Sequence, residues 1–219
     1  MKENSAAMSC RYYLAPDPDL VEAINRSTLA DRIRDKLGRP LTTAGEIRPT
    51  DIVPAFAPSR AGSTSVFPMV WGFSGRTPLF NARVETASQK PTFKEAWQAH
   101  RCAVPASWYY EWRHLTAPDG KKKTGEKMLI QPQGCERFYL AGLYRTEEAA
   151  GIKFPTFTIL TTAPSPSVID IHDRMPLILP TAALEQWIAL KGRPEEVIRL
   201  ALTKMVVEPA PPEQPKVYA

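Results

Sequence analysis

The sequence predicts an α+β fold in a single domain, on three observations. Its 219 residues contain 22 prolines, about twice the usual share of ~5%, which favours short strands and turns over long helices. Apolar residues with helical spacing occur near both ends of the chain, and β-branched and aromatic runs begin at residue 101. Together these patterns predict a half-buried antiparallel sheet with helices around it.

Residues 17–38 predict one or two helices. Asp17-Pro18 is a favourable N-cap and first-turn pair, and Gly38 is a typical stop signal. Between residues 39 and 68, proline, threonine, serine and glycine interrupt brief apolar runs, which predicts short strands joined by turns. Thr92-Phe93-Lys94-Glu95 has the spacing of a capping box, so we expect a short helix over residues 92–100.

From residue 101 onward the pattern predicts mainly strands. Runs of β-branched or aromatic residues between turn residues cover 101–106, 109–113, 127–131, 137–144, 156–162 and 176–179. Helices are expected at about 181–190 and 194–203, the second with Pro194 in its first turn. We expect one domain over residues 1–207, with 1–9 as a leader or atypical N-terminus, and an extended proline-rich tail over 208–219.

The composition predicts a soluble cytoplasmic protein. No run of 18 apolar residues occurs, and the first 15 residues lack a continuous apolar segment, so neither a membrane span nor a secretory signal is predicted. Cys10, Cys102 and Cys135 lack the spacing of a CxxC motif, and their odd number argues against a closed disulfide framework. The net charge of +5 is compatible with a polyanionic partner but does not require one.

His172 is the histidine with the most promising neighbours. Asp170 and Asp173 flank it and Arg174 follows, a cluster that can tune an imidazole for proton transfer near neutral pH. The alternative interpretation is a surface-loop histidine in a salt-bridged turn. His100 and His114 have no comparable neighbours, and no His, Cys or Asp spacing is typical of a metal site. We therefore expect neither a metal nor a cofactor.

Glu111 is the strongest candidate for a proton-handling carboxylate. It lies within Trp108-Tyr109-Tyr110-Glu111-Trp112, where aromatic neighbours desolvate a carboxylate and raise its pKa into a range useful for acid–base chemistry. The alternative is a strand whose exposed face carries one glutamate.

Asn81, Arg83 and Glu85 alternate along the chain, which places them on one face of a predicted strand. That face could bind a phosphate through Arg83 while Asn81 orients a reacting group, although a solvated polar face has the same pattern. Trp71, shortly before it, could offer a nucleobase a stacking surface or could be a core residue.

Six segments of the chain, taken together and in order, resemble the SOS-response-associated peptidase family. They are Trp71-Gly72-Phe73, Asn81-Ala82-Arg83-Val84-Glu85-Thr86, Arg101-Cys102-Ala103-Val104-Pro105-Ala106 with Tyr109-Tyr110-Glu111-Trp112, Ala141-Gly142-Leu143-Tyr144, Thr156-Phe157-Thr158-Ile159-Leu160-Thr161-Thr162 and Ile171-His172-Asp173-Arg174-Met175-Pro176. The resemblance extends over roughly residues 48–180, and its motifs are specific at these separations.

The resemblance implies a fold, a ligand and a reaction. The fold is a single α+β domain with a curved, mostly antiparallel, barrel-like sheet and peripheral helices, and its positively charged groove binds single-stranded DNA or a single-strand to double-strand junction. In the family, the cysteine after the initiator methionine becomes the N-terminus. Its amine condenses with the ring-opened aldehyde of an abasic site, and its thiol closes a thiazolidine ring.

The resemblance also implies a role for each matching residue. Asn81 would position the N-terminal residue, Glu111 would shuttle protons, and His172 would assist opening of the sugar or reversal of the crosslink. The phosphate contacts would come from Arg83 and Arg174, and Trp71 would support the displaced bases. We therefore expect Asn81, Glu111 and His172 to converge on the segment Ser9-Cys10, and we expect Arg11, Arg83 and Arg174 on one basic surface with Trp71 at its edge.

The N-terminus departs from the family pattern, which is Met-Cys-Gly-Arg followed by an aromatic residue. This chain reads Met8-Ser9-Cys10-Arg11-Tyr12, so Ser9 takes the place of the cysteine when the two are aligned without a gap. Translation from Met8 would leave Ser9 as the N-terminus, whereas cleavage of a leader through Ser9 would free Cys10. The family's Tyr-Asn segment is also absent around Arg48-Pro49-Thr50.

Three hypotheses for function remain open from the sequence. The first is a DNA-damage protein that crosslinks to abasic sites through Cys10 or the Ser9 amine. The second is a single-strand binding module without covalent chemistry. The third is a cysteine peptidase that uses Cys10, His172 and Glu111, because a small carboxylate–histidine set can serve many reactions.

Overall fold

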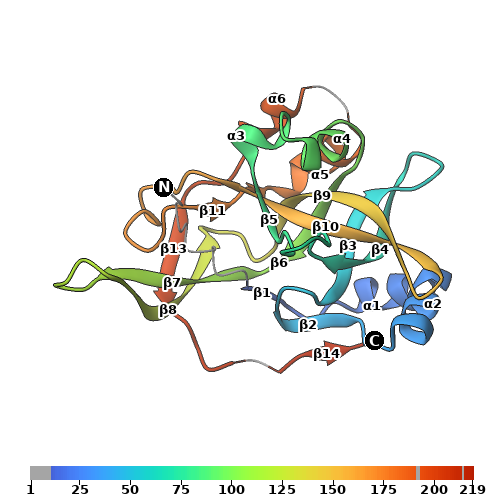
Figure 1. Ribbon diagram of the computed structural model, residues 1–219, viewed down its shortest axis with the longest axis horizontal. Coiled ribbons are helices and arrows are strands. Elements are labelled where there is room, and N and C mark those ends of the chain that lie inside the picture. The colour runs from blue at the N-terminus through green and yellow to red at the C-terminus, as the bar shows by residue number, and fades with distance from the viewer. Residues whose placement is uncertain (1–10, 191–192, 214) are drawn as a thin grey trace.

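Five strands close into a barrel at the centre of the molecule (Figure 1). The computed structural model describes residues 11–190, 193–213 and 215–219, except the side chain of residue 122. Around the barrel the strands follow the order β10 (Ile152–Thr162), β4 (Thr64–Trp71), β3 (Ile52–Pro58), β6 (Arg101–Ala106) and β9 (Phe138–Ala149), and β9 pairs with β10 again. Only the β10–β4 pair among these is parallel.

Three short strands extend the barrel sheet. They are β5 (Asn81–Arg83), which runs parallel to β10, β11 (Met175–Pro176), which pairs with β10, and β12 (Ile178–Leu179), which pairs with β9. The single strand expected at 176–179 is therefore two strands on different neighbours. The α+β class and the curved, mostly antiparallel sheet are confirmed.

A second sheet of six strands lies beside the barrel. Its order is β13 (Met205–Pro209), β8 (Lys122–Pro132), β7 (Trp108–Thr116), β1 (Arg11–Leu14), β2 (Thr42–Ile47) and β14 (Val217–Tyr218). All of its pairs are antiparallel. Both outer strands, β13 and β14, come from the C-terminal 15 residues of the chain. The tail expected over 208–219 is therefore paired at its two ends, at 208–209 in β13 and at 217–218 in β14.

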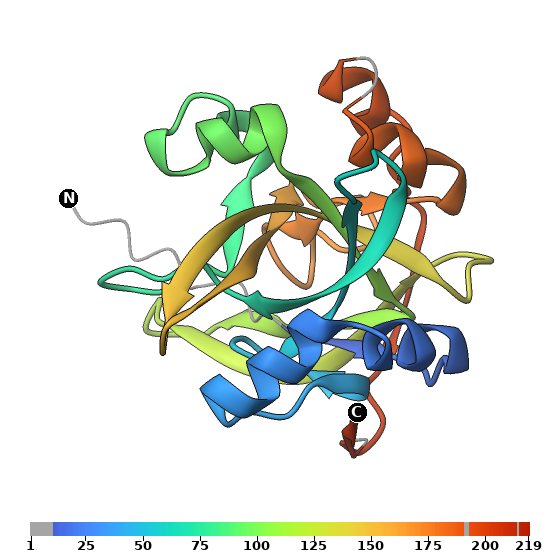
Figure 2. The same cartoon turned by 90° about the vertical axis from the view of Figure 1, so that its right-hand side faces the viewer.

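Two helices, α1 (Pro18–Asn25) and α2 (Thr28–Leu37), cover one end of the barrel (Figure 2). The Asp17 side chain accepts hydrogen bonds from two N–H groups of the first turn of α1, which satisfies donors that the helix itself cannot pair. Gly38 ends α2 with a φ of +61°, a conformation in which glycine carries no steric penalty. Both boundaries predicted from the sequence are confirmed.

The remaining helices lie at the opposite end: α3 (Val84–Ala87), α4 (Pro91–Ala99), η1 (Thr181–Ala183), α5 (Leu184–Ile188) and α6 (Pro194–Ile198). The expected capping box at the start of α4 is wrong. Pro91 begins the helix and Lys90 is its N-cap without a side-chain hydrogen bond, so Thr92 is already helical. Proline is favoured at this first position because the N–H that it lacks would be unpaired there. Helix α6 is also shorter than the expected 194–203.

An aromatic group joins the six-stranded sheet to the barrel. The ring centroid of Tyr12 on β1 lies 5.4 Å from that of Trp71 on β4, which lies 6.0 Å from that of Phe157 on β10. All three side chains are buried, so this group fixes the start of β1 against the barrel wall. Within the described residues, no helix is long and apolar enough to cross a membrane.

Candidate functional site

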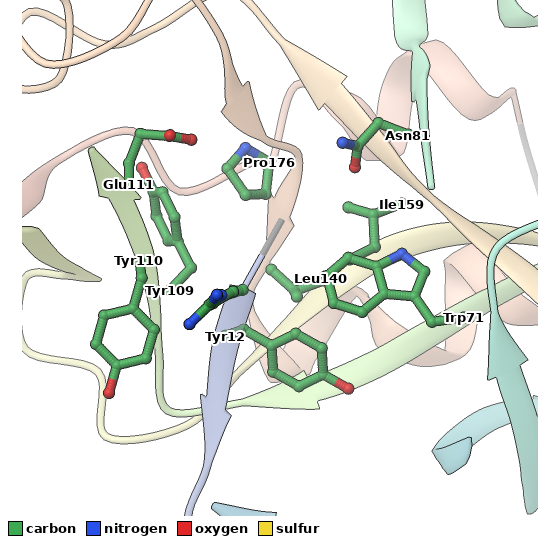
Figure 3. A pocket seen from close by; sticks show the side chains of 10 residues that line it. Tyr12, Trp71, Asn81, Tyr109, Tyr110, Glu111, Leu140, Ile159 and Pro176 are labelled. Atoms are coloured by element: carbon green, nitrogen blue, oxygen red, sulfur yellow. The ribbon is translucent and has the colours of Figure 1, made fainter. Parts of the chain in front are cut away.

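A pocket lies between the first strand of the sheet and the barrel (Figure 3). Its cavity volume is only about 10 Å³, room for about one water molecule. The lining residues are Arg11, Tyr12, Trp71, Asn81, Tyr109, Tyr110, Glu111, Leu140, Ile159 and Pro176. Its polar functional groups include a guanidinium, an amide and a carboxylate, set among apolar and aromatic side chains. Such a combination of a largely apolar lining with few polar groups is typical of a site that orients a reacting molecule.

Strand pairing places Glu111 in this pocket. It lies on β7, directly beyond the residue that pairs with Arg11 on β1, and it faces Met128 on β8. Glu111 is 1% exposed, and its carboxylate accepts a hydrogen bond of 3.1 Å from the Trp112 N–H. Burial, followed by the negative charge of Glu111, raises the pKa of Tyr109 well above its usual value. The alternative of an exposed strand glutamate is therefore wrong.

Asn81 reaches the same pocket from the barrel, on the other side of Pro176 in the view of Figure 3. It begins β5, where it pairs with Ile159 of β10. The Trp71 indole N–H donates a 3.0 Å hydrogen bond to the carbonyl of Phe80, the residue before Asn81. The structure thus brings the predicted Asn81 and Glu111 together and gives each a fixed backbone position.

Trp71 is a core residue and not an exposed ring. It is 1% exposed and packs between Tyr12 and Phe157, so its ring forms part of the buried wall of the pocket. The expected stacking surface for displaced bases is not presented to solvent at this position. Its hydrogen bond to Phe80 instead indicates a positioning role for the strand that carries Asn81.

His172 lies outside the lining of this pocket but is buried, at 2% exposure. The alternative of a surface-loop histidine is therefore wrong. Its Nδ1 accepts a 3.0 Å hydrogen bond from the Arg174 N–H and lies 3.1 Å from a carboxylate oxygen of Asp173. The centroid of its ring is 4.1 Å from that of His114 on β7. Sequence reasoning missed the contact with His114 because a long separation in the sequence hides it.

Glu85 feels the charges of both Arg83 and Arg174. Arg174 forms a two-pronged ion pair with the Glu85 carboxylate, at 2.8 and 2.9 Å, and donates a 2.7 Å hydrogen bond to the Thr161 carbonyl. The hydrogen bond from Arg174 lowers the pKa of Glu85 despite partial burial, and the charges of Arg174 and Arg83 add to this effect.

The expectation that Asn81, Arg83 and Glu85 share one strand face is wrong for Glu85. Strand β5 ends at Arg83, and Glu85 lies in the first turn of α3. An acidic residue is favoured in the first turn of a helix. The ion pair with Arg174 fixes the orientation of the Glu85 side chain.

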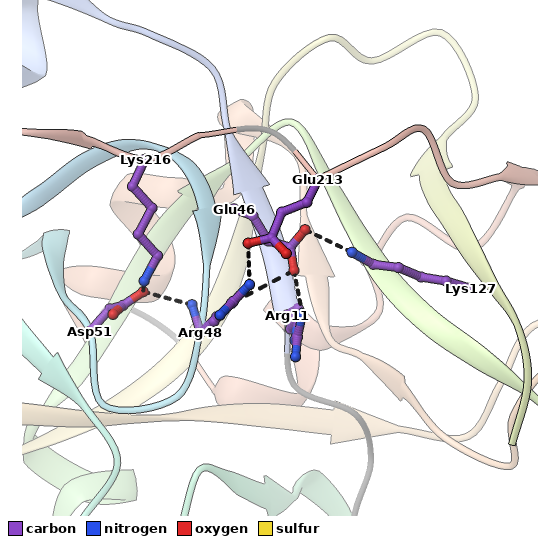
Figure 4. A network of polar contacts seen from close by, with 7 residues as sticks. All are labelled: Arg11, Glu46, Arg48, Asp51, Lys127, Glu213 and Lys216. Atoms are coloured by element: carbon purple, nitrogen blue, oxygen red, sulfur yellow. Dashed lines mark hydrogen bonds and ion pairs between the residues drawn. The ribbon is translucent and has the colours of Figure 1, made fainter.

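Arg11 belongs to a separate network around Glu46 (Figure 4). The Glu46 carboxylate is fully buried on β2 and contacts Arg11 at 2.7 Å, Lys127 at 2.7 Å and Arg48 at 3.9 Å. Burial alone would raise the pKa of Glu46, but the hydrogen bonds and charges of Lys127 and Arg11 outweigh it and lower the pKa. No feature of the sequence around Glu46 indicated this role.

The C-terminal tail takes part in the same network. Glu213 pairs with Arg48, and the Lys216 ammonium lies 2.6 Å from the Asp51 carboxylate. The Lys127 ammonium lies 3.9 Å from the centre of the Tyr110 ring, which adds a cation–π contact. Among the described residues, Arg174 pairs with Glu85, whereas Arg11 pairs with Glu46 in this second network. The expected common basic surface of Arg11, Arg83 and Arg174 stays a prediction.

Ser9 and Cys10 lie outside the described residues, so their predicted convergence with Asn81, Glu111 and His172 stays a prediction. Arg11, which follows Cys10 in the sequence, is the first described residue and lines the pocket. A buried carboxylate and an amide within one pocket can accept, donate and orient protons for a condensation reaction.

Comparison with known proteins gives the family. The model of the SOS response associated peptidase (SRAP) family matches residues 8–218. The chain is 36% identical over 125 residues to the abasic site processing protein YoqW of Bacillus subtilis, covering 57% of this chain and 54% of that protein. It is 31% identical over 143 residues to the abasic site processing protein YedK of Escherichia coli, covering 64% of this chain and 62% of that protein.

Solved structures share the fold. A crystal structure of a protein from Bacteroides thetaiotaomicron is 23% identical, with a TM-score of 0.67 over 92% of each chain. A second, from Bordetella bronchiseptica, is 21% identical, with a TM-score of 0.65 over 92% of this chain and 99% of that one. The chain belongs to the SOS response associated peptidase family. The matched segments span less than two thirds of the YoqW and YedK sequences.

Proposed function

We propose that this protein processes abasic sites in DNA by bonding covalently to them through its N-terminal cysteine region. The observation that carries the proposal is the pocket in which Glu111 and Asn81 lie beside Arg11, the residue after Cys10 in the sequence. The names of the relatives YoqW and YedK, both abasic site processing proteins, support the same substrate.

The proposed reaction needs an amine and a thiol on one residue. An N-terminal amine with a pKa of about 8 is partly neutral at pH 7 and attacks the aldehyde carbon, and loss of water gives an imine. The thiol of the same residue then adds to the imine carbon, and its proton passes to the nitrogen, which closes a thiazolidine. Glu111 carries protons between these groups, Asn81 holds the N-terminal residue, and His172 assists opening of the sugar ring.

The identity of the first residue decides how durable the adduct is. A freed Cys10 supplies both nucleophiles and gives a thiazolidine that survives denaturant. A Ser9 terminus supplies only the amine and a hydroxyl, so its adduct is a reversible imine that promotes strand cleavage by β-elimination. Removal of the leader through Ser9 is therefore part of the proposal.

We propose single-stranded DNA as the form of the substrate, with Arg83 and Arg174 at its phosphates. Arg83 is exposed and Arg174 is partly exposed, so both can approach a phosphate when Glu85 is displaced. A role in the DNA damage response and a cytosolic location fit this activity, since a free cysteine terminus requires reducing conditions.

Intact mass spectrometry and denaturing gels test the proposal directly. The protein is incubated with single-stranded DNA that contains one abasic site, after its own mass has defined its N-terminus. We expect a denaturant-stable adduct whose mass equals protein plus DNA less one water. Cys10→Ala and Glu111→Gln should abolish or strongly slow it, whereas Cys135→Ala, a matched change at a cysteine outside the pocket, should not.

The other outcomes identify the alternatives. An adduct that depends on borohydride and is unchanged in Cys10→Ala would show that an amine acts alone. DNA binding without any adduct would leave a noncovalent binding module. If the DNA stays unmodified while the protein cleaves a peptide substrate, and if that cleavage is lost in Cys10→Ala, the protein is a cysteine peptidase.

A further inference from the structure

Two of the three histidines of the chain lie against each other and beside a carboxylate. His114 lies on β7, and His172 and Asp173 lie on the segment between β10 and β11. Each of the three offers one ligand atom within 4.8 Å of the other two. We propose that His114, His172 and Asp173 form a binding site for a divalent transition-metal ion of the zinc class.

The hydrogen bonds of His172 favour a cation at this place. The Arg174 N–H donates to the His172 Nδ1, so this nitrogen presents a lone pair and carries no proton. The same Nδ1 lies 3.1 Å from the Asp173 carboxylate oxygen, which is also an acceptor. While Nδ1 accepts from Arg174 it cannot also donate to Asp173, so a nitrogen lone pair and an oxygen lone pair face each other across 3.1 Å. A metal ion that takes both lone pairs relieves this repulsion and replaces the hydrogen bond from the Arg174 N–H.

The backbone holds the two histidines together without any metal. The His114 N–H donates a 2.9 Å hydrogen bond to the Ile171 carbonyl, which joins β7 to the residue before His172. The His172 N–H donates to the Val168 carbonyl at 3.0 Å, which fixes the turn on which it lies. The site is therefore largely assembled, and little conformational entropy is lost when an ion binds.

The ligand chemistry selects the kind of ion. Two imidazoles and one carboxylate suit zinc and its neighbours better than magnesium or calcium, which prefer oxygen ligands. Zinc–nitrogen bonds of about 2.0 Å bring tetrahedral ligand atoms to about 3.3 Å from one another. His114 is half-buried and Asp173 is 70% exposed at its side chain, so these two can move the remaining distance while His172 stays fixed.

Occupancy of the site has a consequence that rests on the proposed function. A metal bound to His172 takes the lone pair that would accept a proton during sugar opening or crosslink reversal. Zinc should therefore slow the reaction with abasic DNA through this histidine, without contact to Glu111 or Asn81.

Calorimetric titration of zinc chloride into the chelator-treated full chain tests the site without any DNA. We expect one ion per chain at this site. His114→Ala and Asp173→Asn should each weaken binding by more than about tenfold, a loss that even an outer-shell partner can cause. His100→Ala is the matched control, because His100 packs on Tyr144 and is not part of the cluster. Asp173 is exposed, so its variant should keep the fold.

Absence of zinc binding, or binding unchanged in both His114→Ala and Asp173→Asn, would overturn the proposal. Adduct formation is then measured with and without zinc. We expect zinc to slow wild-type protein and to have little effect on His114→Ala. Zinc binding that depends on His114 and Asp173 in a protein that never forms an adduct would sustain the metal site and refute the proposed reaction.

Discussion

Glu46 is a fully buried carboxylate whose charge is held by Arg11 and Lys127, and this predicts an acid-sensitive fold. Its folded pKa lies below the ordinary value of 4.5. The charged form therefore stabilises the fold above pH 4.5, and this contribution is lost as the pH falls toward the folded pKa. Glu46→Gln should lower the free energy of unfolding at pH 7 by roughly 2–3 kcal/mol, somewhat less than for fully buried pairs because the partner side chains remain partly exposed.

Urea unfolding of the wild type and Glu46→Gln at pH 7 and pH 4 measures this effect. The difference between the two proteins should shrink at the lower pH. Glu22→Gln is the control, since Glu22 pairs with Arg26 on the surface of α1 and such pairs contribute about 0–1 kcal/mol. An equal loss at both pH values would show that the charge of Glu46 is not what stabilises the fold.

Glu85 pairs with Arg174, so its removal should strengthen the proposed binding of DNA. In Glu85→Gln the Arg174 guanidinium keeps its hydrogen bond to Thr161 but loses its carboxylate partner. We expect the affinity for single-stranded DNA to rise about three- to tenfold at low salt, and the dependence on salt to steepen by about 0.7 in the logarithmic slope, as for one more phosphate contact.

Fluorescence anisotropy with a labelled oligonucleotide provides the measurement, and Arg174→Ala should change the affinity in the opposite direction. Glu22→Gln removes the same charge from α1, which lies at the opposite end of the barrel from α3, and should have a smaller effect. If both glutamine variants bind equally, Arg174 does not contact the phosphates.

Gly45 on β2 lies under the C-terminal tail, and the pairing of β14 depends on its missing side chain. Its φ is +95°, and a Cβ placed there would lie 2.3 Å from the Pro215 carbonyl oxygen. Gly45→Ala should therefore strain the backbone and displace the tail, with an expected loss of about 2–4 kcal/mol in the free energy of unfolding.

Gly120→Ala separates the strain of the positive φ from the clash of the new Cβ with the tail. Gly120 also has a positive φ, of +77°, but nothing lies within 4 Å of its missing Cβ. Its variant should lose only about 1–2 kcal/mol, the usual penalty for this backbone conformation. Urea unfolding compares the two, and equal losses would show that contact with the tail contributes nothing.

Elements whose signals are local could be predicted from the sequence, and those set by distant contacts could not. The cap at Asp17 and the stop at Gly38 bounded α1 and α2 correctly because each acts within a few residues. The helical turn at Glu85 could not be predicted, because Arg174 pairs with it from far along the chain.

The same distinction holds for the site. Asn81 and Glu111 were identified from their motifs, and the structure places both in one pocket. His114 and Glu46 carry no local signal, since their partners come from other strands. Trp71 was open to two interpretations, and only its packing against Tyr12 and Phe157 decided for the core.

At the scale of the whole molecule, the net charge of +5 and the exposed arginines should make the proposed DNA binding depend on salt. Arg83, Arg174 and one further basic side chain should neutralise about three phosphates. A plot of the logarithm of the affinity against the logarithm of the salt concentration should then have a slope of about −2. Anisotropy between 50 and 300 mM salt, on the order of the physiological range, measures it. A slope near zero would contradict phosphate contacts as the main source of affinity.

The C-terminal segment provides both outer strands of the six-stranded sheet, and this bears on how readily the chain associates with further copies of itself. An uncovered strand edge offers unpaired N–H and C=O groups to another chain and promotes aggregation. Deletion of residues 210–219 would uncover the edge of β2, and deletion of 205–219 would uncover that of β8 as well. We expect light scattering to show self-association that increases from the full chain to the shorter deletion and again to the longer one. The same degree of self-association in all three proteins would mean that the exposed edges are protected in another way.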